Sequence, residues 1–142
     1  MKMCAAKALF WYNMEQEQRV LLVNLQAEKA KRFLAQADEM VGLKHWDLSA
    51  NRYYYACFHA VQALFVSKNV NAHTHAGISA QFSLHFVKTG VVDVVYGSFL
   101  ARMFQLRQKA DYNCAYEISE EEVREIIGLS HDFVNVVLSL AE

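Results

Sequence analysis

An arginine and an aspartate four residues apart, Arg107 and Asp111, are the first candidates for chemistry in this sequence. Residues at that spacing lie on one side of an α-helix, and this side also carries the apolar residues Tyr96, Leu100 and Met103. Burying a charge costs free energy unless the charge is paired, so we expect an ion pair lining a partly solvated groove. The alternative is a salt bridge that only closes the end of a helical bundle.

A second polar ridge is expected on the helix that precedes. Arg52, Tyr55, His59 and Gln62 follow one another at steps of three, four and three residues, so they share one narrow helical face. Such side chains suit contacts with phosphates and nucleobases. They equally suit hydrogen bonds between packed helices, with the arginine in solvent, and the spacing leaves both interpretations open.

The other histidines give weaker evidence for a functional site. His73, His75 and His85 lack the cysteine or carboxylate partners that would make a metal site specific, so we expect no metal. His131 lies in an apolar stretch and is expected at the edge of the core. We find no glycine-rich phosphate loop, nucleophile elbow or paired-carboxylate motif. The sequence therefore predicts no cofactor.

Helices must position these residues. The chain has 142 residues, of which 54% are hydrophobic, with five glycines and no proline. Apolar positions recur at steps of three and four, and no segment alternates with a period of two. The fold expected is all-α, an antiparallel up-and-down bundle of four to five helices. We assign it to residues 14–142, after an N-terminal extension of residues 1–13.

The helix boundaries follow from capping signals. Asp47 and Asp93 are expected N-caps, and Ser119 and Glu122 form a capping box. The predicted helices cover about residues 15–43, 48–68, 78–88 and 93–112, with a last helix after Ser119.

Composition also limits the environment and the partners. The net charge of −1 excludes a global excess of positive charge, so we expect no DNA binding, and any RNA contact must be local. The apolar segment 1–13 is too short to span a membrane and lacks a cleavage site, so we expect no membrane association. Cys4, Cys57 and Cys114 are widely spaced and predict small core residues in a reducing cytoplasm. Nine phenylalanines and seven tyrosines predict a homodimer that hides excess apolar surface.

Four motifs in order resemble the HEPN domain family over about residues 15–140. They are SANRYYYACFHAVQAL at 49–64, HAG at 75–77, FVKTG at 86–90 and LRQKADY at 106–112. The resemblance implies a bundle of four or five helices, commonly dimeric. It also implies a gene often found beside a minimal nucleotidyltransferase, as half of a two-component or toxin–antitoxin module.

Members of that family that cleave RNA without metal carry an arginine, four to six further residues and a histidine. Here Arg107 is kept, but Asp111, Tyr112 and Asn113 stand where the histidine is expected. Tyrosine is a poor base at neutral pH, and a paired aspartate is a weak one, so ribonuclease activity is expected to be absent or very low. The catalytic residues stay unassigned, with Arg107, Asp111 and Tyr112 as candidates.

The leading hypothesis is a HEPN partner protein that binds a nucleotide or RNA in an arginine-lined groove and acts with a nucleotidyltransferase. The candidate binding residues are Arg52, Tyr55, His59, Arg107 and Asp111, and we expect the two polar ridges to face each other across this groove. One alternative is a metal-independent endoribonuclease toxin, which requires a histidine within reach of Arg107. The other is a structural adaptor without a ligand.

Overall fold

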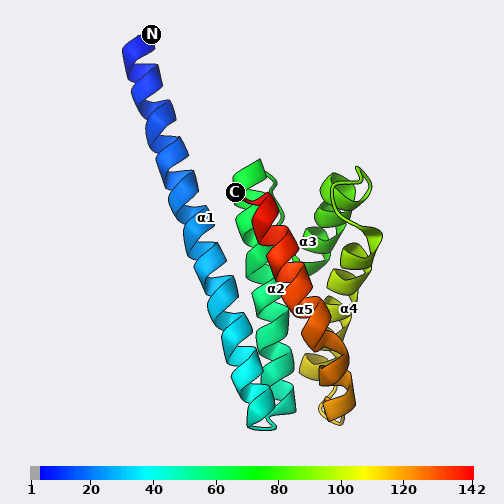
Figure 1. Ribbon diagram of the computed structural model, residues 1–142. Helices are drawn as coiled ribbons and strands as arrows, with labels where there is room; N and C mark the ends of the chain where they lie inside the picture. The colour runs from blue at the N-terminus through cyan, green and yellow to red at the C-terminus, as the bar shows by residue number, and fades with distance from the viewer. Residues whose placement is uncertain (1–3) are drawn as a thin grey trace.

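The computed structural model describes residues 4–142, apart from the side chain of Trp11, and these residues form helices and no strand (Figure 1). The predicted all-α fold is confirmed. The elements are α1 (Ala5–Gly42), α2 (Trp46–Lys68), α3 (His75–Phe82), the π-helical turn η1 (Ser83–Val87), α4 (Val94–Tyr112) and α5 (Glu120–Leu140).

Local capping fixes two helix starts as predicted. The Ser119 hydroxyl accepts a hydrogen bond from the Glu122 amide at 3.2 Å, and the Glu122 carboxylate accepts one from the Ser119 amide at 3.3 Å, which completes the capping box of α5. Asp93 accepts from the amide of Val95 at 2.9 Å and starts α4. These side chains satisfy backbone amides that have no partner within the helix.

The other starts differ from the prediction. α1 begins at Ala5 rather than near residue 15, because the alanine-rich segment before Asn13 favours helix and contains no breaker. α2 begins at Trp46, so Asp47 lies in its first turn instead of capping it. α3 begins at His75, because the Thr74 hydroxyl accepts from the Gly77 amide at 2.9 Å. The segment expected as one helix over 78–88 is divided between α3 and η1.

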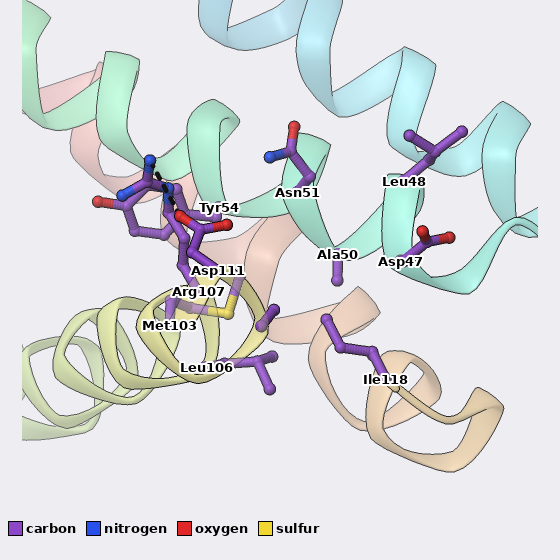
Figure 2. Close-up of a pocket in the computed structure, with 11 residues that line it drawn as sticks. Asp47, Leu48, Ala50, Asn51, Tyr54, Met103, Leu106, Arg107, Asp111 and Ile118 are labelled. Atoms are coloured by element: carbon purple, nitrogen blue, oxygen red, sulfur yellow. Dashed lines mark ion pairs between the residues drawn. The ribbon is translucent and has the colours of Figure 1, made fainter. Parts of the chain in front are cut away.

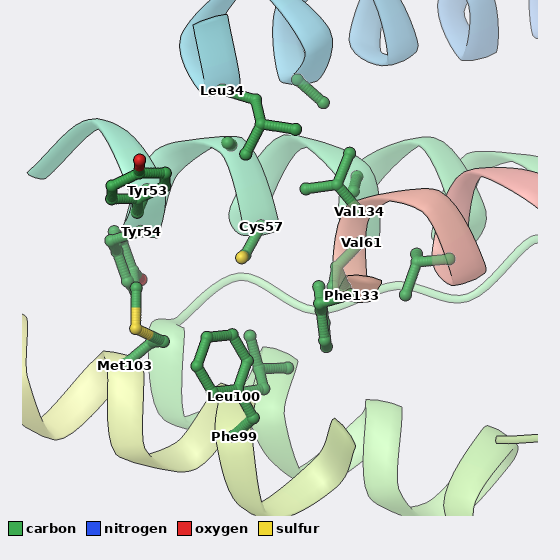
Figure 3. Close-up of a cluster of buried hydrophobic side chains, with 14 of the residues drawn as sticks. Leu34, Tyr53, Tyr54, Cys57, Val61, Phe99, Leu100, Met103, Phe133 and Val134 are labelled. Atoms are coloured by element: carbon green, nitrogen blue, oxygen red, sulfur yellow. The ribbon is translucent and has the colours of Figure 1, made fainter. Parts of the chain in front are cut away.

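α2 is the central helix and contacts α1, α4 and α5. Its alanines Ala56, Ala60 and Ala63 are completely buried, and small side chains allow neighbouring helices to approach closely. The Phe133 ring of α5 lies within the buried cluster (Figure 3). Its centroid is 5.6 Å from that of Phe82. Its ring also lies 5.9 Å from Phe99 and 6.1 Å from Tyr96, so one aromatic side chain joins α3, α4 and α5.

The cysteine prediction is correct at one position of three. Cys57 is buried in the core, whereas Cys4 and Cys114 are exposed. Cys4 precedes α1, and Cys114 lies in the turn between α4 and α5, so neither belongs to an apolar helical face. All three are free thiols.

The N-terminal half of α1 extends beyond the rest of the bundle, as Figure 1 shows. At 1.5 Å per residue, its 38 residues give a helix about 57 Å long. Up to Leu25, this helix exposes large apolar side chains. They are Leu9, Phe10, Tyr12, Val20, Leu21, Leu22 and Leu25. Within residues 4–142, no helix combines the length and the apolar character that crossing a bilayer requires.

The capping box of α5 supplies the first testable prediction. Ser119→Ala removes the hydroxyl that accepts from Glu122 and should lower the free energy of unfolding by about 1 kcal/mol, measured by urea denaturation. Ser139→Ala is the matched control, because Ser139 lies near the other end of α5 and its exposed hydroxyl only donates to the Val136 carbonyl. We expect this control within about 0.5 kcal/mol of wild type. Equal effects of the two substitutions would contradict the importance of the cap.

Candidate functional site

A groove of about 330 Å³ opens between α2, α4 and the residues before α5 (Figure 2). Arg107 and Asp111 lie on its wall, with Nη2 and Oδ2 3.3 Å apart, so the predicted ion pair is formed. The Arg107 side chain is 24% exposed and that of Asp111 is 46% exposed. The complete lining is Asp47, Leu48, Ala50, Asn51, Tyr54, Met103, Leu106, Arg107, Ala110, Asp111 and Ile118.

Aromatic side chains hold the Arg107 guanidinium in place. Its Cζ atom lies 5.3 Å from the Tyr54 ring centroid and 5.2 Å from that of Tyr55. Both distances are in the range of cation–π attraction. Burial raises the pKa of the Tyr54 hydroxyl above its ordinary value, so this hydroxyl keeps its proton. Arg107 is therefore fixed by α2 although it is carried by α4.

A histidine does lie next to Arg107, but it comes from α3. His75 Nε2 is 3.4 Å from Arg107 Nη1, and His75 Nδ1 is hydrogen-bonded to the Tyr54 hydroxyl. The imidazole also stacks on Phe104, with 5.6 Å between ring centroids. From the sequence, His75 is a candidate only as a metal ligand, and its position beside Arg107 is not predicted. Thr74, as an N-cap, was the available signal that His75 begins a helix.

The surroundings of His75 define its protonation. Burial and then the charge of Arg107 lower the pKa of the imidazole below its usual value, and Asp111 partly opposes them. A neutral imidazole has one donor and one acceptor nitrogen. Because the guanidinium can only donate, Nε2 is the acceptor and Nδ1–H donates to Tyr54. The basic nitrogen of His75 thus faces Arg107.

Arg52 and His59 do not line this groove, so the expected composite groove is corrected. The Arg52 guanidinium lies over the Phe33 ring of α1, with Cζ 4.7 Å from the centroid. His59 Nδ1 lies 2.8 Å from Gln26 Oε1, also on α1. The ridge predicted on α2 therefore lies at the seam with α1. Of its members, Tyr55 contacts Arg107.

The remaining candidates lie apart from the Arg107 site. Tyr112 is 86% exposed at the end of α4 and makes no contact with Arg107. His85 Nε2 is hydrogen-bonded to Gln81, and His131 Nε2 pairs with Asp38 at 2.9 Å, at the core edge where it was expected. Within residues 4–142, no three metal-binding side chains of His, Cys, Asp or Glu come together.

This arrangement can hold and act on a phosphate group. An arginine is the side chain best suited to bind phosphate oxygens in two-point contact, and a neutral histidine beside it can accept a proton. Asp111 holds the arginine in position and is itself half-exposed, so an incoming anion can replace it.

The fold and the site define an all-helical bundle with an arginine held between two tyrosines and a histidine. Residues 23–140 match the model of the HEPN domain, and the chain therefore belongs to the HEPN domain family. It is 34% identical over 129 residues to a Methanocaldococcus jannaschii protein named "Putative toxin MJ0605", covering 91% of this chain and 92% of that one. It is 32% identical over 108 residues to "Putative toxin MJ0142" of the same organism, covering 76% and 74%. A Thermotoga maritima "UPF0332 protein" is 34% identical over 114 residues, covering 80% and 86%.

The geometry predicts how His75 titrates. In Asp111→Asn the nearby negative charge is lost, so the pKa of His75 should fall below its wild-type value, as followed by NMR of the imidazole. Asp132→Asn removes an exposed carboxylate on α5 and is the matched control. A His75 pKa that stays unchanged or rises in Asp111→Asn would show that the two side chains are not neighbours in solution.

Proposed function

We propose that this HEPN protein is a toxin that binds and cleaves RNA, with Arg107 on the scissile phosphate and His75 as the base. The observation that carries the proposal is the 3.4 Å approach of His75 Nε2 to Arg107 Nη1. It meets the requirement of the endoribonuclease alternative, a histidine within reach of Arg107. The names of the two Methanocaldococcus jannaschii relatives support the toxin assignment.

The proposed reaction uses the 2′-hydroxyl of RNA as nucleophile. This oxygen forms a bond to the adjacent phosphorus while its proton passes to His75 Nε2, and the bond from phosphorus to the 5′-oxygen breaks. The imidazolium then returns the proton to that 5′-oxygen, which leaves a 2′,3′-cyclic phosphate and a 5′-hydroxyl. Arg107 donates to the phosphate oxygens, whose charge grows in the transition state. These steps require no metal.

Asp111 does not prevent phosphate from binding. An exposed i,i+4 ion pair is worth only about 0.3–0.5 kcal/mol, and that of Arg107 has a half-exposed partner. A phosphate can offer the guanidinium two charge-assisted hydrogen bonds in exchange. We infer that Asp111 holds Arg107 in position until the phosphate replaces it.

A second candidate function is binding of a single nucleotide by a partner of a nucleotidyltransferase, in a two-component module. The groove supports it, because Asn51 and Asp47 offer polar groups for a base or ribose beside the apolar Leu48 and Ile118. The phosphate would again lie at Arg107. In this function His75 would position the guanidinium and transfer no proton.

Cleavage of a labelled single-stranded RNA in the presence of EDTA tests the leading proposal. His75→Gln should lower the cleavage rate about 10²- to 10⁴-fold, because it removes the base, and should leave RNA binding within a few-fold of wild type. Arg107→Ala should weaken both binding and cleavage. His73→Gln is the matched control, since His73 is exposed and two residues away.

Wild-type protein that binds ATP or another nucleotide at Arg107 and leaves RNA intact would overturn the ribonuclease proposal in favour of the nucleotide-binding function. Cleavage that persists in His75→Gln would refute the role of His75 as the base.

We also propose that the protein forms a homodimer through α1. The exposed apolar side chains of α1 between Leu9 and Leu25 support this, because large apolar side chains gathered on one exposed segment often mark a contact surface between proteins. This apolar surface lies toward the end of α1 that is far from the loop into α2. There α1 extends beyond the rest of the bundle (Figure 1). A closed twofold pairing of two such helices would cover it.

Light scattering at tens of micromolar should give twice the chain mass of 16.3 kDa. Leu21→Glu combined with Leu25→Glu should shift the protein to monomer, since both side chains are about half exposed on α1. Leu84→Glu, with an equally exposed leucine on η1, is the control. A wild-type monomer at this concentration would refute the dimer.

A further inference from the structure

Three cations surround one aromatic ring on the α1–α2 seam. Arg52 Cζ, Lys29 Nζ and Arg32 Cζ lie 4.7, 5.7 and 6.0 Å from the ring centroid of Phe33. Lys29 and Arg32 are exposed, while Arg52 and Phe33 are half-buried. We call these four residues the Phe33 cluster.

The positive charge of the Phe33 cluster is not neutralised by ion pairs. Among the described residues, no carboxylate lies within ion-pair distance of Lys29, Arg32 or Arg52. Glu28 precedes Arg32 by one helical turn and still does not pair with it. A protein with a net charge of −1 thus gathers three uncompensated cations at one place. Such a local patch is an electrostatic site for an anion.

The positive charges of the Phe33 cluster also affect the pKa of His59. Burial, then Lys29 and Arg32, lower the pKa of its imidazole to about 4, so the ring is neutral at physiological pH. Nδ1–H donates to Gln26 Oε1, at 2.8 Å, and Nε2 is left as an acceptor. A hydroxyl or amine of a ligand on this surface could donate to it.

A continuous row of rings connects the Phe33 cluster with Arg107. The centroids of Phe33 and His59 are 5.3 Å apart, and those of His59 and Tyr55 are 6.3 Å apart. Tyr55 in turn lies 5.2 Å from Arg107 Cζ. Phe33, His59 and Tyr55 are all partly exposed. Cations therefore stand at both ends of a strip of aromatic side chains that crosses α2.

We propose that this strip is a binding track for single-stranded RNA, with Lys29, Arg32 and Arg52 on the backbone and Arg107 on the phosphate to be cleaved. Single strands are held by this combination, in which bases stack on aromatic rings and cations follow the phosphates. The inference rests on the proposed RNA substrate and extends it, because it predicts that a longer strand is preferred to a dinucleotide. An acidic protein partner would need the cations and would gain little from the rings.

The test compares a 12-nucleotide single-stranded RNA with a dinucleotide, using the whole 142-residue chain. Lys29→Gln/Arg32→Gln removes two exposed charges with a good helix former. Because each single-strand phosphate contact contributes about 0.7 to the slope of log K against log salt, the slope should fall by about 1.4. Relative to 1 M salt, where these contacts contribute nothing, the affinity for the 12-mer at 0.1 M salt should then fall roughly 25-fold. His75→Gln serves as the background for the binding assays, so that the RNA stays intact.

A ratio of rate constants and two further variants distinguish a loss of the track from a general loss of positive charge. The ratio of kcat/KM for the 12-mer to that for the dinucleotide should fall in Lys29→Gln/Arg32→Gln. Lys31→Gln, with an exposed cation that lies away from Phe33 on the same helix, should keep the wild-type ratio. Arg52→Gln should weaken 12-mer binding in the same direction.

The outcomes separate this inference from the proposed function. If the wild-type protein cleaves the 12-mer and Lys29→Gln/Arg32→Gln behaves like Lys31→Gln, the track is refuted and the ribonuclease stands. If the wild-type protein neither binds nor cleaves RNA, the proposed function fails and the track fails with it. An equal loss of affinity for polyglutamate would also refute the track, because the surface would then recognise negative charge without bases.

Discussion

The rest of the site depends on the placement of one guanidinium among aromatic side chains. Arg107 is carried by α4, packs against Tyr54 and Tyr55 of α2, and meets His75 of α3. A charge that is three-quarters covered must find partners, and its partners here come from three helices. The two terminal nitrogens of this one side chain therefore contact the histidine on one side and a half-exposed carboxylate on the other, and the basic nitrogen of His75 is turned toward the guanidinium.

The central helix α2 contributes side chains to both the Arg107 site and the Phe33 cluster. Its completely buried residues hold α1, α4 and α5 in the core, and its partly exposed residues face outward on both sides. Tyr55 belongs to both surfaces, since it contacts Arg107 and His59. The chemistry proposed at Arg107 and the binding proposed at Phe33 would thus use separate contacts of one helix, so substitutions at one should leave the fold of the other intact.

The sequence predicts correctly those features of the structure that depend on residues only a few positions apart. The Arg107–Asp111 pair and the capping box of α5 follow from spacing along one helix, and both are formed. The contact of His75 with Arg107 joins residues 32 positions apart, so no local pattern reveals it. Likewise, periodicity grouped Arg52 with His59 but could not say that α1, rather than α4, would pack beside them. The order of helices around α2 is a property of the whole core.

The most direct measurement follows both side chains of the site while a ligand binds. A dinucleotide with a 2′-deoxy sugar at the cleavage position cannot react, so it can be titrated into the protein at equilibrium, with NMR detection of the His75 imidazole and the Arg107 Nε–H. If Arg107 and His75 share one phosphate, both resonances move with the same dissociation constant, and the His75 change disappears in Arg107→Ala. Binding that leaves either resonance unmoved would contradict a shared phosphate between Arg107 and His75.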